Sequence, residues 1–179
     1  MTRTLRALAL GLACLTLTGV DATAEVVDRS ASGFTVRTTV AVAATPQRIY
    51  QDLLNIGAWW DKAHTYSGDA KNMTLIAQPG GCFCETFAGG AVEHGRVVNV
   101  SPNRMMRISS ALGPLQEMAT IGTMTWTIEP AKQGPGSTLT MTYAASGYAP
   151  GGMDKLADIV DTVLGQQVKL LKAYAEKTK

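Results

Sequence analysis

From Met73 onward the chain alternates short strand-like segments with turns rich in glycine and proline, and it then closes with one long helical pattern. The strand-like segments are "MTLIA", "CFCETF", "VEHGRVVNV", "RMMRISSAL", "GTMTWTIEP" and "STLTMTYAAS". The last two alternate large apolar residues with threonines, which predicts antiparallel strands with one solvated face. From about Met153 apolar residues recur every three or four positions, which predicts a helix whose apolar face packs on the sheet.

The segments before Met73 add one strand and one short helix. "GFTVRTTVAVAA" alternates apolar residues from Phe34 to Val42, which predicts a half-buried strand. Thr45 and Pro46 are an N-cap and a first helical residue, and Gly57 is a suitable end for this helix. Residues 25–32 are expected to be a short lead-in. The predicted fold class is α+β: a twisted antiparallel sheet of about seven strands around a long C-terminal helix, with short helical segments after the first strand.

The chain length and charge limit the possible partners. A chain of 179 residues can form one domain with a substantial core, and no linker divides it. The formal net charge is only +2, and the basic residues are scattered along the chain. Because nucleic-acid binding usually requires clustered basic residues, we expect no nucleic-acid partner.

The first residues have the pattern of an export signal. Arg3 and Arg6 precede the apolar run "ALALGLACLTLTGV", and Ala22-Thr23-Ala24 supplies the small residues that signal peptidase requires. We expect a signal peptide over residues 1–24, a mature domain over residues 25–179, and a periplasmic or secreted protein. The apolar run is too short for an integral membrane span. A lipoprotein signal using Cys14 is the alternative, although Gly11 stands where such signals usually carry leucine.

Cys82 and Cys84 are the cysteines that remain after the predicted cleavage. On a regular strand their Cα atoms would be roughly 6.5 Å apart, near the upper limit for a disulfide, so we expect small fillers rather than a bonded pair. Their redox state stays open. A metal set of these cysteines with His64 and His94 has suitable ligands but unsuitable spacing, and a cysteine–histidine nucleophile meets the same objection. We predict no metal and no cofactor.

The most specific polar cluster is predicted on the hairpin formed by "CFCETFAGGAVEHGRVV". A four-residue turn over 88–91 would place Glu85 opposite His94 and Phe83 opposite Arg96, all on one inward face. A carboxylate beside a histidine would raise the pKa of the imidazole and could orient it for proton transfer. The same cluster could orient a ligand, or it could be a self-satisfied network that holds the hairpin.

Other candidate ligand contacts are aromatic or soft side chains. Trp59, Trp60, His64 and Tyr66 fall in an irregular segment, where aromatic residues could contact a hydrophobic ligand or plug one end of the core. The remaining candidates are expected to face inward from strands and are Phe83, Trp126, Met141 and Tyr143.

The order of elements and several phrases resemble the START-like superfamily, also called SRPBCC or polyketide-cyclase-like, whose architecture is the helix-grip fold. The phrases are "TPQRIYQDLLNIGAWW", the "GG.F.E" turn and strand, "GRVVNVSPNRMMRIS", "LGPLQ" and "STLTMTYAASGY". The resemblance covers about residues 33–175. It implies a cavity between the sheet and the C-terminal helix that accepts a hydrophobic small molecule.

This resemblance defines fold more closely than activity, because one fold supports many functions. We expect binding of a lipid- or polyketide-like molecule rather than catalysis. The first alternative is a cyclase- or hydratase-type enzyme in which Glu85 and His94 perform acid–base chemistry. The second is a protein-interaction module related to chaperone-ATPase activators, which the predicted export signal disfavours. The sequence identifies no protein partner.

Overall fold

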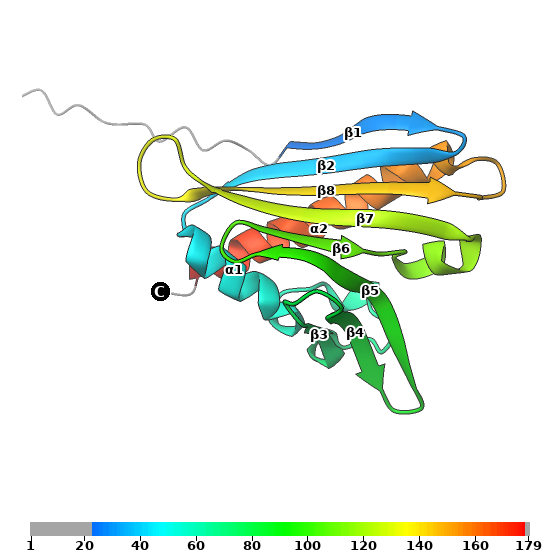
Figure 1. The fold of residues 1–179 in the computed structure, drawn as a ribbon, viewed down its shortest axis with the longest axis horizontal. Helices are drawn as coiled ribbons and strands as arrows, with labels where there is room; N and C mark the ends of the chain where they lie inside the picture. Colours follow the sequence, from blue (N-terminus) through cyan, green and yellow to red (C-terminus); the bar gives the residue numbers. More distant parts are fainter. Residues whose placement is uncertain (1–22, 178–179) are drawn as a thin grey trace, which may run out of the picture.

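The computed structural model describes residues 23–177, and their strands form one antiparallel sheet (Figure 1). The strands follow the order β1-β2-β8-β7-β6-β5-β4-β3 across the sheet. Neighbours along the chain are therefore mostly neighbours in the sheet, while β2 and β8 join its two halves. The strands are β1 (Thr23–Ser30), β2 (Gly33–Val42), β3 (Met73–Leu75), β4 (Cys82–Phe87), β5 (Gly90–Ser101), β6 (Met105–Ser109), β7 (Thr120–Pro130) and β8 (Ser137–Gly147).

Helix α1 (Pro46–Leu54) begins as the sequence predicts. The side chain of Thr45 accepts a hydrogen bond from the backbone N–H of Arg48 at 3.2 Å, and Pro46 occupies the first turn. Short 3-10 helices then carry the chain to β3 and occur again near β7 and α2. They are η1 (Ile56–Ala58), η2 (Lys62–His64), η3 (Ala70–Asn72), η4 (Gly113–Met118) and η5 (Met153–Leu156).

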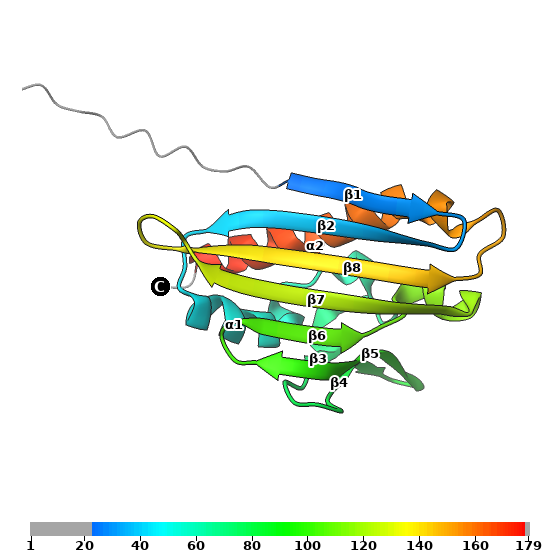
Figure 2. The same cartoon turned by 45° about the horizontal axis from the view of Figure 1, so that its top comes forward.

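Helix α2 (Ala157–Lys177) crosses one face of the sheet beneath β1 and β2, and its C-terminal end reaches α1 (Figures 1 and 2). Polar contacts hold both ends of the helix. Arg29 of β1 pairs with Asp158 at 2.6 Å, and Nζ of Lys172 donates to the carbonyl oxygen of Ala41 at 2.7 Å. The apolar stripe predicted from the sequence buries Leu164 and Leu171 in the core.

The predicted helix-grip arrangement is confirmed, with eight strands in place of about seven. The additional strand is β1, which lies where a lead-in was expected. The side chains of β1 are exposed except that of Val26, which is partly buried against the core. An edge strand of this kind shows no alternation of apolar and polar residues, so periodicity could not reveal it.

The predicted signal peptide lies largely outside the described residues. Thr23 and Ala24, its last two residues, pair with Thr39 and Thr38 at the start of β1. Within residues 23–177 no helix combines the length and hydropathy needed to span a membrane.

Candidate functional site

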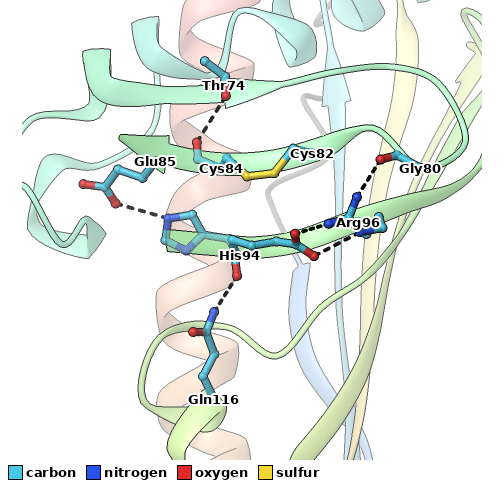
Figure 3. Close-up of a disulfide and its surroundings, with 9 residues drawn as sticks. Thr74, Gly80, Cys82, Cys84, Glu85, His94, Arg96 and Gln116 are labelled. Carbon is cyan, nitrogen blue, oxygen red and sulfur yellow. Dashed lines mark hydrogen bonds and ion pairs between the residues drawn. A yellow bond between two sulfur atoms is a disulfide. The ribbon is translucent and has the colours of Figure 1, made fainter. Parts of the chain in front are cut away.

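Glu85 and His94 meet on the inward side of the β4–β5 hairpin. Nε2 of His94 lies 3.1 Å from Oε2 of Glu85, and their side chains are only 5% and 0% exposed (Figure 3). The carboxylate also accepts backbone N–H groups from Tyr66 at 3.0 Å and from Ser67 at 2.6 Å. Glu85 thus joins two strands to the segment that follows η2.

A β-bulge directs His94 toward Glu85. The hairpin turn is two residues shorter than expected, so Glu85 pairs with Val92 rather than with His94. Between Phe83 and Cys84 the partner then changes from Gly95 to Glu93, which leaves His94 as the extra residue of β5. A bulge bends the strand and re-aims a side chain, and here it turns the imidazole inward.

The predicted inward position of Arg96 is wrong because of the same bulge. An extra residue reverses the alternation of faces beyond it, so Arg96 is exposed, the opposite of the expectation, and its neighbour Val97 is buried. Nη1 of Arg96 donates to the carbonyl oxygen of Gly80 at 2.9 Å, and its guanidinium pairs with Glu93. Arg96 is therefore not part of the Glu85–His94 cluster.

Burial and hydrogen bonding determine the protonation of this pair. Burial raises the pKa of Glu85, but the hydrogen bonds from Ser67, Tyr66 and His94 outweigh this effect and hold the pKa below its usual range. Burial lowers the pKa of His94, and the neighbouring carboxylate offsets this only in part. The expected rise in the imidazole pKa is therefore wrong. The pair is a carboxylate beside a neutral imidazole whose Nε2–H donates to it.

The second ring nitrogen of His94 is the group left for chemistry. With the proton on Nε2, the lone pair lies on Nδ1. Among residues 23–177 no hydrogen bond to Nδ1 is present. The glutamate, in contrast, has both oxygens occupied.

Aromatic rings form a continuous chain from β7 to this pair. The distances between successive ring centroids are 6.1, 5.5, 5.6, 5.0 and 5.8 Å. Every step is within the range of favourable aromatic contact. The rings, in order, belong to Trp126, Trp59, Trp60, Phe83, His94 and Tyr66.

Trp59 and Trp60 are core residues with satisfied indole groups. Nε1 of Trp59 donates to the carbonyl oxygen of Asp52 at 2.8 Å, and Nε1 of Trp60 donates to that of His64 at 3.1 Å. Both side chains are buried, whereas Tyr66 is 50% exposed. The two tryptophans are part of the core, and the half-exposed Tyr66 ring lies 5.8 Å from that of His94.

His64 is bound to α2 rather than to the hairpin. Its Nδ1 lies 3.1 Å from Nε2 of Gln167, and Oε1 of Gln167 accepts the backbone N–H of Asp61 at 3.0 Å. Gln167 is fully buried. It interrupts the apolar stripe between Leu164 and Leu171, and this polar residue on a buried helical face was the available sequence signal for the contact.

The remaining predicted contact residues lie in the core. Trp126, Met141 and Tyr143 are 2% exposed or less, and they point inward from β7 and β8. The hydroxyl of Tyr143 donates to the carbonyl oxygen of Ser110 at 3.1 Å, and burial raises the pKa of Tyr143 to about 12. Side chains therefore fill this part of the space between the sheet and α2.

An open groove lies at the end of α1, beside the short edge strand β3. Its volume is about 520 Å³, and it is lined by residues 54–58 on one side and by Lys71 and residues 73–76 on the other. Ile56, Met73 and Leu75 are buried core residues and form its apolar base. Lys71 is the charged residue among those that line it.

Cys82 and Cys84 form a disulfide on the outward face of β4 (Figure 3). The expectation of two unbonded fillers is wrong. Their Cα atoms are 5.3 Å apart, closer than on a regular strand, because the ladder is distorted where the register shifts next to Cys84. The distance is typical of disulfides.

The metal set considered from the sequence does not assemble. His94 lies on the inner face and His64 contacts α2, so neither reaches the cysteines. Ligand-type atoms do come together on Cys82, Cys84 and Glu93, within 4.8 Å of one another. The sequence did not indicate Glu93 as a ligand because the predicted strand pairing placed no cysteine opposite it.

Comparison with known proteins defines the class. Residues 33–176 match the family described as polyketide cyclase / dehydrase and lipid transport, and the chain belongs to this family. The fold is the helix-grip fold of the START-like superfamily. A search of curated protein sequences finds no significant match.

Solved structures show the same fold at low sequence identity. A protein from Mesorhizobium loti superposes with a TM-score of 0.59 at 18% identity, covering 81% of this chain and 98% of that one. CalU16 from Micromonospora echinospora gives 0.56 at 12% identity, covering 87% and 84%. The di-domain ARO/CYC protein StfQ from the steffimycin biosynthetic pathway gives 0.55 at 17% identity, covering 83% of this chain and 52% of StfQ.

Proposed function

We propose that this protein binds a hydrophobic or amphipathic small molecule, of lipid or polyketide type, at the groove between η1 and β3. The observation that carries this proposal is the base of the groove, where core residues Ile56, Met73 and Leu75 meet an open volume of about 520 Å³. Volumes of this size suit small ligands, and apolar walls supply most of their affinity. The family description, which names polyketides and lipids, agrees with this chemistry.

Polar groups at the groove define the ligand further. Lys71 and Asn55 line it, and no carboxylate does. An ammonium group without an acidic neighbour in the groove favours a ligand with an anionic or strongly electron-rich end. The proposed ligand therefore places an apolar body on the base and an acidic group beside Lys71.

The interior between the sheet and α2 is the proposed extension of this site. Met124, Met141 and Met153 are fully buried there, and methionine side chains adapt readily to a changed neighbour. A ligand longer than the groove would displace these side chains, whereas a short one would leave them in place. A ligand would therefore occupy the groove first, and only a long one would then displace the buried methionine side chains.

Two fluorescent probes test the groove. We expect 1-anilinonaphthalene-8-sulfonate, an apolar anion, and N-phenyl-1-naphthylamine, its neutral counterpart, both to bind. Lys71→Met should weaken the anionic probe by up to about fivefold and leave the neutral probe nearly unchanged, because one exposed charge pair contributes at most about 1 kcal/mol. Lys132→Met, in the β7–β8 turn, is the matched control.

Filling the groove tests its location. Gly57→Trp is unsuitable because a Cβ there would meet backbone at 2.9 Å, so Ala58→Trp, at an exposed lining position on η1, is the better variant. It should abolish binding of both probes without loss of stability. Equal binding by Ala58→Trp and the unchanged protein would contradict the proposal.

The natural ligand can be sought by native mass spectrometry of protein purified from the periplasm or the medium of the cells that produce it. A co-purifying lipid-like mass that Ala58→Trp loses would support the groove. A co-purifying mass retained by that variant would instead locate the ligand elsewhere and overturn this assignment.

Acid–base catalysis is the second candidate, and the free Nδ1 of His94 is the observation that favours it. A neutral imidazole oriented by a carboxylate can accept a proton through its other nitrogen. In an enzyme of this kind, Glu85→Gln and His94→Gln would each abolish turnover, whereas in a binding protein they would only change affinity. Full turnover of a substrate by His94→Gln would exclude this role.

We propose further that the protein is exported and that its mature chain begins at Glu25. The leader pattern of residues 1–24 supports this. Intact-mass measurement of protein from the periplasm or medium tests it. A mass that retains residues 1–24, or one that carries lipid on Cys14, would contradict cleavage after Ala24.

A further inference from the structure

We propose that Cys82 and Cys84 form a thiol–disulfide exchange site on the outer face of the sheet, in which Cys82 forms the mixed disulfide and Cys84 resolves it. Their natural reaction partner is an accessible disulfide or dithiol. The site borders the groove at Thr74, whose hydroxyl donates to the carbonyl oxygen of Cys84 at 3.4 Å, and the Glu85–His94 pair lies on the opposite face of the same hairpin (Figure 3).

This disulfide contributes little to holding the fold together. A cross-link stabilises mainly by restricting the unfolded chain, and the restriction is smallest for the shortest loops. This one encloses only Phe83. That residue is 1% exposed and packs against Trp60 and His94, so core packing already holds β4. The pair can therefore change its redox state on a rigid strand.

The disulfide is accessible from the outer face of the sheet. Cys82 and Cys84 are half-buried on a face that α2 does not cover, and their strand partners on β5, Arg96 and Glu93, are exposed. Thiol exchange requires in-line approach of an external sulfur to one of the two bonded sulfurs. A disulfide within the core would not allow this.

A charged residue lies opposite each cysteine. Arg96 is the direct cross-strand partner of Cys82, and Glu93 is that of Cys84. The carboxylate and both sulfurs lie within 4.8 Å of one another. Arg96 pairs with Glu93 and also donates to the carbonyl oxygen of Gly80 at 2.9 Å, so its guanidinium is held next to the Glu93 carboxylate. A guanidinium favours a thiolate at Cys82, and a carboxylate can accept the proton of Cys84.

The reaction balances with an external disulfide as oxidant. The thiolate of Cys82 attacks one partner sulfur, the partner's S–S bond breaks, and a Cys82–partner bond forms. The released partner sulfur takes a proton. Cys84 then gives its proton to Glu93 and attacks Sγ of Cys82, which expels the second partner sulfur, and Glu93 passes the proton on. The partner disulfide gains two electrons and two protons, and Cys82 and Cys84 are oxidised. An external dithiol drives the same steps in reverse.

Trapping of the intermediate tests the assignment. The full chain with Cys14→Ser serves as the background, so that Cys82 and Cys84 are its only cysteines. After addition of glutathione disulfide, Cys84→Ser should accumulate a mixed disulfide seen by intact-mass measurement. Cys82→Ser should react several times more slowly. Equal rates in the two variants would overturn the proposed order.

The pH profile of Cys82 alkylation tests the role of Arg96. In the Cys84→Ser background, Arg96→Gln should shift the profile of iodoacetamide reaction to higher pH and reduce the rate near pH 7 by roughly three- to tenfold. Arg107→Gln, on β6, is the control. Circular dichroism checks that each variant is folded. An unshifted profile in folded Arg96→Gln would remove Arg96 from the site.

Equilibration of the unchanged pair completes the test. In the Cys14→Ser background, glutathione redox buffers should interconvert the disulfide and dithiol while the near-ultraviolet circular dichroism stays constant. Reduction of insulin disulfides by the dithiol form would indicate a protein partner, and reaction with glutathione alone a small one. A pair that stays oxidised in excess reduced glutathione, or that reacts only on unfolding, would overturn the proposal.

Discussion

The Oε2 atom of Glu85 accepts hydrogen bonds from Nε2 of His94 and from the backbone N–H of Tyr66, while Oε1 accepts the N–H of Ser67. One carboxylate therefore joins β4, β5 and the segment after η2. The side chain is fully buried, so each of these donors would lack a partner if the carboxylate were lost. This connection positions His94 and the aromatic chain that ends at Tyr66.

Glu85→Gln should lower the free energy of unfolding by about 2 kcal/mol. Both carboxylate oxygens accept hydrogen bonds, so the amide NH₂ group of glutamine would face an N–H donor and leave it without an acceptor. Urea denaturation followed by circular dichroism measures this. Glu93→Gln, on the adjacent strand but exposed, should cost less than about 1 kcal/mol. Equal losses in the two variants would show that the buried hydrogen bonds of Glu85 contribute no more to the free energy of unfolding than the exposed contacts of Glu93.

The unfolding free energy should fall as the pH drops from about 6.5 to 5. Burial holds the pKa of His94 below its ordinary value, so the folded state favours the neutral ring. Below the pKa of histidine in the unfolded chain, about 6.5, the unfolded state binds more protons and stability is lost. The lowered pKa of Glu85 adds a further loss below about pH 4.3.

Urea titrations at several pH values measure this dependence. In His94→Gln the loss between about pH 6.5 and 5 should become smaller, whereas the loss at lower pH should persist. A pH dependence in that range that His94→Gln leaves unaltered would assign it to another group.

Thr38→Val should raise the free energy of unfolding by about 1 kcal/mol. The hydroxyl of Thr38 is fully buried on β2 and has no hydrogen-bond partner among the described residues. Replacing such a group by a methyl of similar shape removes its desolvation cost. Thr39→Val is the control, because the Thr39 hydroxyl bonds that of Thr140 at 3.2 Å on the solvated face. A destabilised Thr38→Val would imply a water partner for this hydroxyl.

Gly95→Ala should destabilise the protein by about 1–3 kcal/mol, because a Cβ at the bulge would lie 2.7 Å from the carbonyl oxygen of Ser109 and 2.8 Å from Ile108. Gly165→Ala, within α2, should have the opposite effect. Its Cβ would meet Ala24 at 3.4 Å, an ordinary contact, and alanine favours a helix over glycine by about 0.5–1 kcal/mol. Thermal unfolding distinguishes the two signs. A neutral Gly95→Ala would contradict the close approach at the bulge.

Much of the fold was predictable because it depends on strong periodic patterns. Met124, Trp126 and Leu139 alternate with threonines in β7 and β8, and the structure buries them as the pattern predicts. Thr45 and Pro46 likewise specify the start of α1 through local hydrogen bonding. β1 escaped prediction because an exposed edge strand has no buried face to produce a pattern.

The candidate site was less predictable because it depends on register. The sequence brings Glu85 and His94 to one hairpin, but the shorter turn and the bulge decide which residues face each other. A glycine within a strand often marks a bulge, so Gly95 was the available signal for the reversed face of Arg96. The polar Gln167 in the apolar stripe of α2 indicates a buried polar contact, but no local pattern identifies its partner His64, which is more than a hundred residues away in the sequence.

The aromatic chain contains the tryptophans that dominate the intrinsic fluorescence of this protein. Its three tryptophans, Trp59, Trp60 and Trp126, are neighbours within this single chain of rings. Trp59 directly follows the segment that forms one wall of the groove. Intrinsic fluorescence therefore arises from one place in the molecule, and it should respond to occupation of the groove without any attached dye.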